Sequence, residues 1–162
     1  SGRMFSELLT FINDCTAPIF WVGTCNSYQE LRAELLQRFE LMVFCDLPNR
    51  REREEIWNIH IRKTGRNPKN FDISRISQQS NGFVGREIEV MLKEAMESGF
   101  DDNMREFTTS DIINQISRSV PTSRQKKETI DAMRNWAKTN CMLASDPETE
   151  QENTPNGVYV ET

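Results

Sequence analysis

Apolar side chains recur at helical spacing along most of this 162-residue chain, apart from a region near its start. Phe5, Leu8 and Ile12 lie about one helical turn apart, so they predict an amphipathic helix over residues 4–13. A run of turn-forming residues that closes with Pro18 follows this segment and predicts the end of the helix.

Two short apolar runs interrupt the helical pattern, at residues 19–23 and 41–47. Neither alternates between apolar and polar positions, which is typical of parallel strands covered on both faces. A short helix is predicted between them, over residues 28–37. The pattern therefore predicts a slice of a parallel α/β sheet. Because two strands do not make a stable parallel sheet, we expect further strands earlier in the protein.

From Pro48 onward the pattern is entirely helical. Asn49 followed by Glu52 has the spacing of a capping box and predicts a helix over residues 50–64. The other predicted helices cover residues 71–80, residues 86–98, a segment capped by Thr108 or Thr109, and a last segment whose capping box is Thr122 with Gln125. The predicted core positions are Ile73, Ile76, Ile88, Met91, Leu92, Ala95, Met96, Ile112, Ile113, Ile116, Ile130, Met133 and Trp136.

These patterns divide the chain into four parts. They are an α/β slice over residues 1–48, an all-α subdomain over 49–120, a C-terminal helix over 121–145 and a tail over 146–162. The tail carries five acidic residues and no basic one, which accounts for the whole net charge of −5. A polar, acidic segment with few apolar residues is predicted to be disordered.

Charge and composition exclude several classes of protein. Because residues 1–145 are electrically balanced, the body offers no basic field for nucleic acid. No run of apolar residues suggests a membrane span or a signal peptide, so we expect a cytoplasmic protein, or one of the plastid stroma. The four cysteines lack C-x-x-C spacing, and we expect buried free thiols. His60 is the single histidine, so a histidine-based metal site is not expected.

Five short motifs occur in one order along the chain. They are an apolar strand ending in T-x-N, then LL-x-RFE, a strand ending in LP, R-x-x-x-I-x-x-x-H, and G-F-x-G-x-E-I-E followed by E-A. In this combination, residues 3–119 resemble the C-terminal part of an AAA ATPase module, from just after its Walker B strand through its helical lid. The segment after Pro121 is similar to the end of the stand-alone AAA ATPases of cyanobacteria, plastids and their phages.

The resemblance implies two catalytic residues in the first part of the chain. Asn26 follows the end of an apolar strand, where ligands bind in parallel α/β sheets, and matches the sensor-1 residue. Arg38 matches the arginine finger, which stabilises charge on the γ-phosphate of a neighbouring subunit. The chain has one arginine at this motif, where the family usually has two. The alternatives are that Asn26 only closes a turn and that Arg38 pairs with Glu34 or Glu40.

The resemblance implies four further site residues in the helical part. Ile56 and His60 lie on one helix face, where Ile56 would pack the adenine and His60 would touch the base or ribose. Gly85 would lie against the base or sugar, and Arg86 stands at the sensor-2 position, suited to contact the γ-phosphate. The alternatives are a packed core histidine for His60 and a solvated first-turn arginine for Arg86.

The phosphate-binding and metal-binding motifs of the family do not occur in this sequence. No Gly-Lys pair is present, so there is no Walker A loop, and no apolar strand ends in the acidic pair of Walker B. ATP and Mg²⁺ are therefore expected as cofactors of an intact enzyme, and this chain alone is expected neither to bind them tightly nor to hydrolyse ATP.

Two functions remain open at this point. In the first, the chain is the C-terminal portion of an ATPase that works as a ring, with itself or other AAA subunits as partners, to remodel protein substrates. In the second, it is a truncated, non-catalytic protein that joins or caps such a ring. A DNA-associated adaptor of clamp-loader type is disfavoured by the balanced charge of the body.

Overall fold

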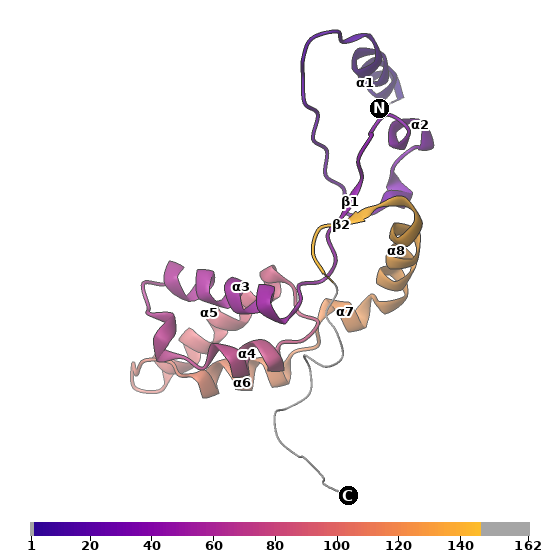
Figure 1. The fold of residues 1–162 in the computed structure, drawn as a ribbon. Helices are drawn as coiled ribbons and strands as arrows, with labels where there is room; N and C mark the ends of the chain where they lie inside the picture. The colour runs from indigo at the N-terminus through magenta and orange to yellow at the C-terminus, as the bar shows by residue number, and fades with distance from the viewer. Residues whose placement is uncertain (1, 147–162) are drawn as a thin grey trace, which may run out of the picture. The chain divides into compact units, whose positions relative to one another are not determined.

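The computed structural model describes residues 2–146, with side chains from Ser6 onward. The chain forms two compact units (Figure 1). The N-terminal unit runs to Phe44 and includes Asp131–Leu143, and the helical unit comprises Cys45–Ile130 with the residues after Leu143. The predicted disordered tail lies outside the described residues, except for Asp146.

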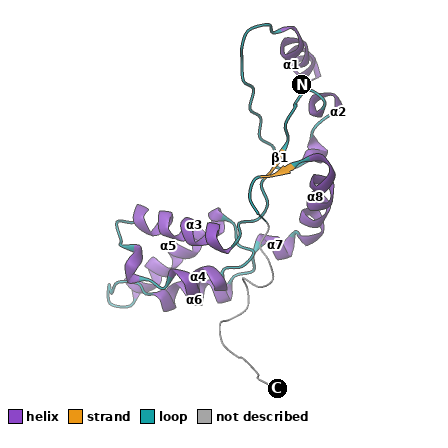
Figure 2. Ribbon diagram, viewed as in Figure 1, coloured by secondary structure: helices purple, strands orange, loops and turns teal. Residues whose placement is uncertain are grey.

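The N-terminal unit holds a small parallel sheet and short helices (Figure 2). Val43 of β1 lies opposite Met142 of β2, and the Met142 N–H donates to the Met42 carbonyl at 2.9 Å. The predicted N-terminal helix is confirmed by α1. The elements of this unit are α1 (Gly2–Asp14), the 3-10 turn η1 (Tyr28–Glu30), α2 (Ala33–Leu36), β1 (Val43–Phe44), most of α8 (Lys127–Asn140) and β2 (Met142–Leu143).

The strand predicted at residues 19–23 is wrong for this structure. The segment has no strand conformation, and Phe20 and Val22 are 89% and 77% exposed. A strand that is apolar on both faces needs neighbouring strands to pair its backbone and cover its side chains. None of the strands within residues 2–146 pairs with this segment, so Phe20 and Val22 stay in solvent, while Trp21 makes an edge-to-face contact with Phe11.

Other predictions for this unit hold only in part. The predicted helix over residues 28–37 is broken into η1 and α2, and the strand predicted over 41–47 is reduced to β1. The predicted core residue Trp136 of α8 is half-buried and stacks on Tyr28, with ring centroids 4.2 Å apart. Stacked aromatic pairs at this distance stabilise a fold beyond the area that they bury.

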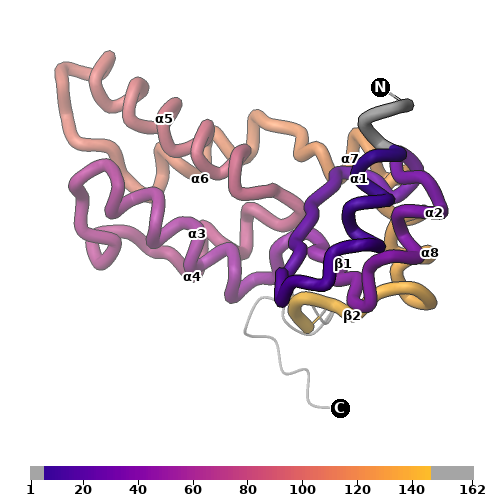
Figure 3. The backbone as a smooth tube through the Cα atoms, turned by 90° about the horizontal axis from the view of Figure 1, so that it is seen from above, coloured from indigo at the N-terminus to yellow at the C-terminus, as the bar shows by residue number. Residues whose placement is uncertain are grey.

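The helical unit packs four main helices around one apolar core. Helix α3 packs on α4, and α5 packs on α6 (Figure 3). The elements are α3 (Arg50–Lys63), the 3-10 turn η2 (Pro68–Asn70), α4 (Ile73–Gln79), α5 (Gly85–Asp101), α6 (Thr109–Arg118) and the single turn α7 (Thr122–Gln125). The buried cluster contains Trp57, Ile61, Ile76, Phe83, Ile88, Met91, Leu92, Ala95, Phe107, Ile112 and Ile116, with Ile73, Met96 and Ile113 packed against it.

The predicted start of the first of these helices is confirmed. The Asn49 side chain accepts from the Glu52 N–H at 3.0 Å, and the Glu52 carboxylate accepts from the Asn49 N–H at 2.9 Å. One turn later, the fully buried Arg53 donates to the carbonyl oxygens of Pro48 and Ser77, at 2.7 and 3.0 Å. Arg53 therefore ties the segment that enters α3 to the end of α4.

The capping box predicted for Thr122 and Gln125 is wrong. The Thr122 N–H and hydroxyl both donate to Glu87 of α5, at 2.7 and 2.6 Å, and the Gln125 amide donates to the Val120 carbonyl. Because Glu87 lies 35 residues earlier, no local sequence pattern could reveal this contact. The contact fixes α7 to the first turn of α5.

The cysteines are free thiols, but none of them is fully buried as predicted. Cys25 and Cys45 are exposed, whereas Cys15 and Cys141 are half-buried. The exposure of Cys25 has the same cause as that of Phe20: the apolar segment before it pairs with no strand of the described chain. Burial raises the pKa of the Cys141 thiol.

The ion pair between Arg105 and Asp111 predicts how stability depends on pH. The Arg105 guanidinium donates to both Asp111 oxygens, at 2.7 and 2.8 Å, and this lowers the pKa of Asp111. An unfolded aspartate has a pKa of about 4, so the stabilisation is complete above that value and is lost as pH falls below it. We expect Asp111→Asn to reduce stability at pH 7 and to flatten the acid side of the stability curve, measured by urea unfolding. If the stability of Asp111→Asn fell at acidic pH as steeply as that of the parent chain, the proposed effect of the ion pair would be contradicted.

Candidate functional site

The candidate site is built around the turn that enters α5. Gly82 has a φ of +81°, which suits glycine, and a Cβ there would stand 2.5 Å from the Ser123 hydroxyl. Phe83 is buried in the core and anchors the turn to it. The turn thus fixes the position of Gly85, which is the first residue of α5.

Gly85 and Ile56 lie side by side. A Cβ on Gly85 would stand 3.8 Å from the Ile56 Cγ2 atom, so the bare glycine backbone borders the apolar side chain. Ile56 is half-buried and belongs to α3, and His60 follows it one turn later on the same face. The structure therefore brings these three predicted site residues to one face between α3 and α5.

The environment of His60 favours its neutral form. The imidazole is half-buried, and burial is the main cause that lowers its pKa. Lys63 and Lys93 lower it further, while Glu89 acts in the opposite direction. A neutral imidazole both donates and accepts a hydrogen bond, which suits contact with a heterocyclic base or a ribose hydroxyl.

The first turn of α5 also carries Arg86 and Glu87. Arg86 is exposed, and its side chain forms no hydrogen bond or ion pair with the part of the chain that the structure describes. Its guanidinium lies at the positive end of the helix dipole, so this end of α5 favours an anion. Sequence reasoning missed Glu87, which accepts from the Val84 N–H at 2.9 Å and from Thr122. The glutamate three residues after the helix boundary was the available signal.

The two predicted catalytic residues of the N-terminal unit are exposed. Asn26 follows the unpaired apolar segment, and Arg38 follows α2. Within residues 2–146, neither side chain forms a hydrogen bond or an ion pair, so Arg38 pairs with neither Glu34 nor Glu40. Asn26 and Arg38 belong to the N-terminal unit, whereas Ile56, His60 and Gly85 belong to the helical unit.

The described residues contain no group of three or more His, Cys, Asp and Glu side chains able to hold a metal ion. None of the helices within residues 2–146 has the length and hydrophobicity of a transmembrane span.

Sequence comparisons identify related proteins. The chain is 39% identical over 140 residues to the AAA domain-containing protein ycf46 of Pyropia yezoensis, which covers 85% of this chain and 28% of the relative. It is 35% identical over 94 residues to the ATP-dependent zinc metalloprotease FtsH 2 of Petrotoga mobilis, covering 57% of this chain and 15% of that protein. The chain thus spans little more than a quarter of the first relative's length. No family model matches it.

Structural comparison gives the same fold. The FIGL-1 AAA domain in complex with ADP superposes with a TM-score of 0.70 and 22% sequence identity, covering 88% of this chain and 53% of that domain. The described chain therefore has the fold of one end of an AAA domain, with a small parallel sheet and a helical part. The fold predicted from the sequence, an α/β slice followed by a helical lid, is confirmed.

Proposed function

The chain belongs to the AAA ATPase family, and on that premise we propose that it completes an ATP-hydrolysing module by supplying the sensor residues and the lid. The observation that supports this most strongly is the face on which Gly85, Ile56 and His60 meet. It combines an apolar side chain, a bare backbone and a neutral imidazole. Such a surface fits the flat base and the sugar of a nucleotide.

The residues of this face fit ATP, and each of them would contact a different part of the nucleotide. Ile56 would pack the adenine, His60 and Gly85 would contact the base or ribose, and Arg86 would face the phosphates. Bound ATP supplies the phosphoryl group that is transferred to water. Within residues 2–146, no group of three or more His, Cys, Asp and Glu side chains is placed to hold a metal ion, so Mg²⁺ would be held by other residues of the intact enzyme.

Asn26 and Arg38 would act on the reaction itself. The Asn26 amide, which can donate and accept, would orient the attacking water. The Arg38 guanidinium would stabilise charge on the γ-phosphate held by a neighbouring subunit, which requires a head-to-tail contact between copies. Such contacts close into a ring, and ring ATPases of this kind would couple lid movement to the remodelling of a protein substrate.

Nucleotide contact can be tested in a chimera of the Pyropia yezoensis relative, in which this chain replaces the matched region. We call this chimera the region-swapped protein. We expect 8-azido-ATP, after illumination, to label the peptides that carry Ile56 and His60 or Gly85. Excess ATP should remove the label, and His60→Ala should reduce it severalfold.

The matched control is Ile59→Ala, on the exposed side of the same helix, which should leave labelling unchanged. Labelling confined to peptides outside α3 and the start of α5 would contradict the proposed lid contact. In that case the region-swapped protein would still bind nucleotide, but the nucleotide would not contact the face formed by Ile56, His60 and Gly85.

A further inference from the structure

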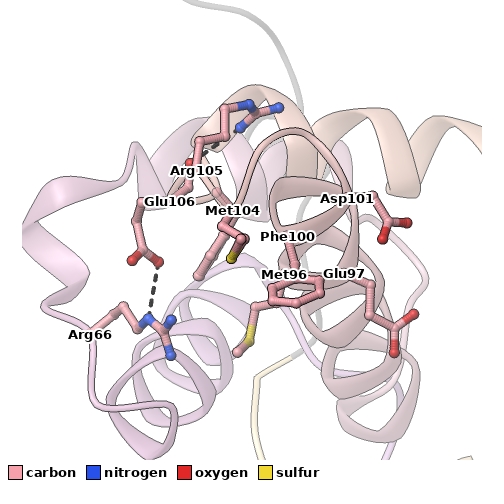
Figure 4. Close-up of a pocket in the computed structure, with 9 residues that line it drawn as sticks. Arg66, Met96, Glu97, Phe100, Asp101, Met104, Arg105 and Glu106 are labelled. Carbon is pink, nitrogen blue, oxygen red and sulfur yellow. Dashed lines mark hydrogen bonds and ion pairs between the residues drawn. The ribbon is translucent and has the colours of Figure 1, made fainter.

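A hollow lies at the opposite end of α5 from Gly85. It has a volume of about 470 Å³. Its lining combines the apolar residues Met96, Phe100, Met104 and Phe107 with the charged residues Arg66, Glu97, Asp101, Arg105 and Glu106. Phe100 is 66% exposed and Met104 is 77% exposed. Figure 4 shows Met96, Phe100 and Met104 grouped between Arg66 and Glu106 on one side and Glu97 and Asp101 on the other. We call this the Phe100 surface.

The backbone that presents Met104 is unusual. Asn103 and Met104 both have a φ of 54°, in the left-handed region that favours glycine. A long apolar side chain held there in solvent is unfavourable on two counts, backbone conformation and exposure. Left-handed residues of this kind cluster at binding sites, where the fold holds them in place.

The turn is firmly held. A Cβ on Gly99 would stand 2.8 Å from the Arg105 carbonyl oxygen, so the returning chain packs directly on the α5 backbone. Arg105 is fixed by its paired bonds to Asp111, and the Met104 N–H donates to the Phe100 carbonyl at 2.9 Å. The Phe100 surface is therefore preorganised, and a partner would not have to order it.

The charges around the Phe100 surface are unevenly balanced. Arg66 is paired with Glu106 at 3.0 Å, whereas Glu97 and Asp101 form no ion pair with any residue that the structure describes. Both also line an adjoining hollow with Glu94, on one stripe of α5. Arg105, which also lines the first hollow, is paired with Asp102 and Asp111, and Arg118 lines the adjoining one. Carboxylates outnumber cations around the apolar residues, so they create a negative potential.

We propose that the Phe100 surface binds a basic amphipathic segment of a partner protein. Apolar side chains of that segment would pack on Met96, Phe100 and Met104, and its lysines or arginines would face Glu97 and Asp101. Methionine and an exposed aromatic are adaptable apolar anchors for such a helix. The chain's own acidic tail and nucleic acid are poor occupants, because both carry the same sign of charge as the rim.

The Phe100 surface lies far from Gly85 along α5. Gly99 lies fourteen positions after Gly85 in the helix, a rise of about 21 Å along α5. A partner could therefore bind here without covering Gly85. The proposal does not depend on nucleotide binding, so its failure and the failure of the proposed function are distinguishable.

The test uses the 162-residue chain and a fluorescent peptide of leucine and lysine at helical spacing, with a peptide carrying glutamate for lysine as the reference probe. We expect the lysine peptide to bind, and Glu97→Lys with Asp101→Lys to weaken binding by about tenfold or more. Phe100→Ser should weaken it to a similar extent. Raising the salt from about 50 to 300 mM should also weaken binding.

The matched control is Glu55→Lys with Glu128→Lys, two exposed carboxylates outside this surface, which changes the net charge equally. It should leave affinity within about twofold of the parent chain. Equal losses in both double variants, or equal binding of the glutamate peptide, would overturn the proposal. Dimers in sedimentation that disappear with Phe100→Ser would also overturn it, by assigning the Phe100 surface to a second copy of this chain.

Discussion

Replacing Arg38 by alanine in the region-swapped protein is expected to abolish ATP turnover, by about a thousandfold or more, with little change in ATP affinity. The γ-phosphoryl group develops charge over its oxygens as it leaves, and a planar guanidinium stabilises that charge. Arg38 is exposed and pairs with no acidic residue that the structure describes, so it is available to a neighbouring subunit. Phosphate release and nucleotide binding measured together separate the two effects.

Two further variants sharpen this prediction. Arg38→Lys keeps the charge but not the planar fork, so it should restore little of the turnover. Arg124→Ala removes an exposed arginine of α7 and should leave turnover nearly unchanged. Survival of turnover in Arg38→Ala would show that this residue is not the arginine finger.

Replacing Trp57 by alanine is expected to destabilise the helical unit by about 4 kcal/mol. Trp57 is fully buried in the core, and its indole N–H donates to the Ser80 hydroxyl at 3.0 Å. The substitution removes a large apolar side chain and leaves a cavity that the neighbouring helices cannot fill completely. Because a small domain is stable by only about 5–15 kcal/mol, much of its stability would be lost.

Trp57→Phe separates the two contributions. It keeps most of the ring and loses the hydrogen bond to Ser80, so we expect a loss of about 1–2 kcal/mol. Unfolding in urea, followed by far-ultraviolet circular dichroism, measures both variants. A loss below about 1 kcal/mol for Trp57→Ala would mean that this core is not organised around the indole.

The helices were predictable because their signals are local. The Asn49–Glu52 capping box and the stripe of Ile88, Leu92 and Ala95 each need only a few neighbouring residues, and the structure confirms both. Their apolar faces also find partners within the helical unit, so local pattern and packing agree.

The errors have non-local causes. The apolar segment at residues 19–23 has the composition of a strand, but strand formation depends on partners that the described chain does not provide. The strand β2 has only two residues and is defined by its pairing with β1, so no local sequence pattern could predict it. Thr122 contacts Glu87, which lies far away in sequence.

The candidate site was predictable to a similar extent. Spacing on α3 places Ile56 and His60 on one face, and the structure adds Gly85 beside them. The anchoring role of Glu87 depends on the start of α7, which no spacing rule relates to α5. The position of Asn26 depends on strand pairing, and within residues 2–146 the apolar segment before it pairs with no strand.

The central claim is that this chain completes an AAA ATPase module, and the most direct measurement is steady-state ATP hydrolysis. Three proteins are compared: the chain alone, the unmodified Pyropia yezoensis relative and the region-swapped protein. We expect no turnover from the chain alone, and turnover by the region-swapped protein within about tenfold of the relative. An active relative with a folded but inactive region-swapped protein would contradict the claim.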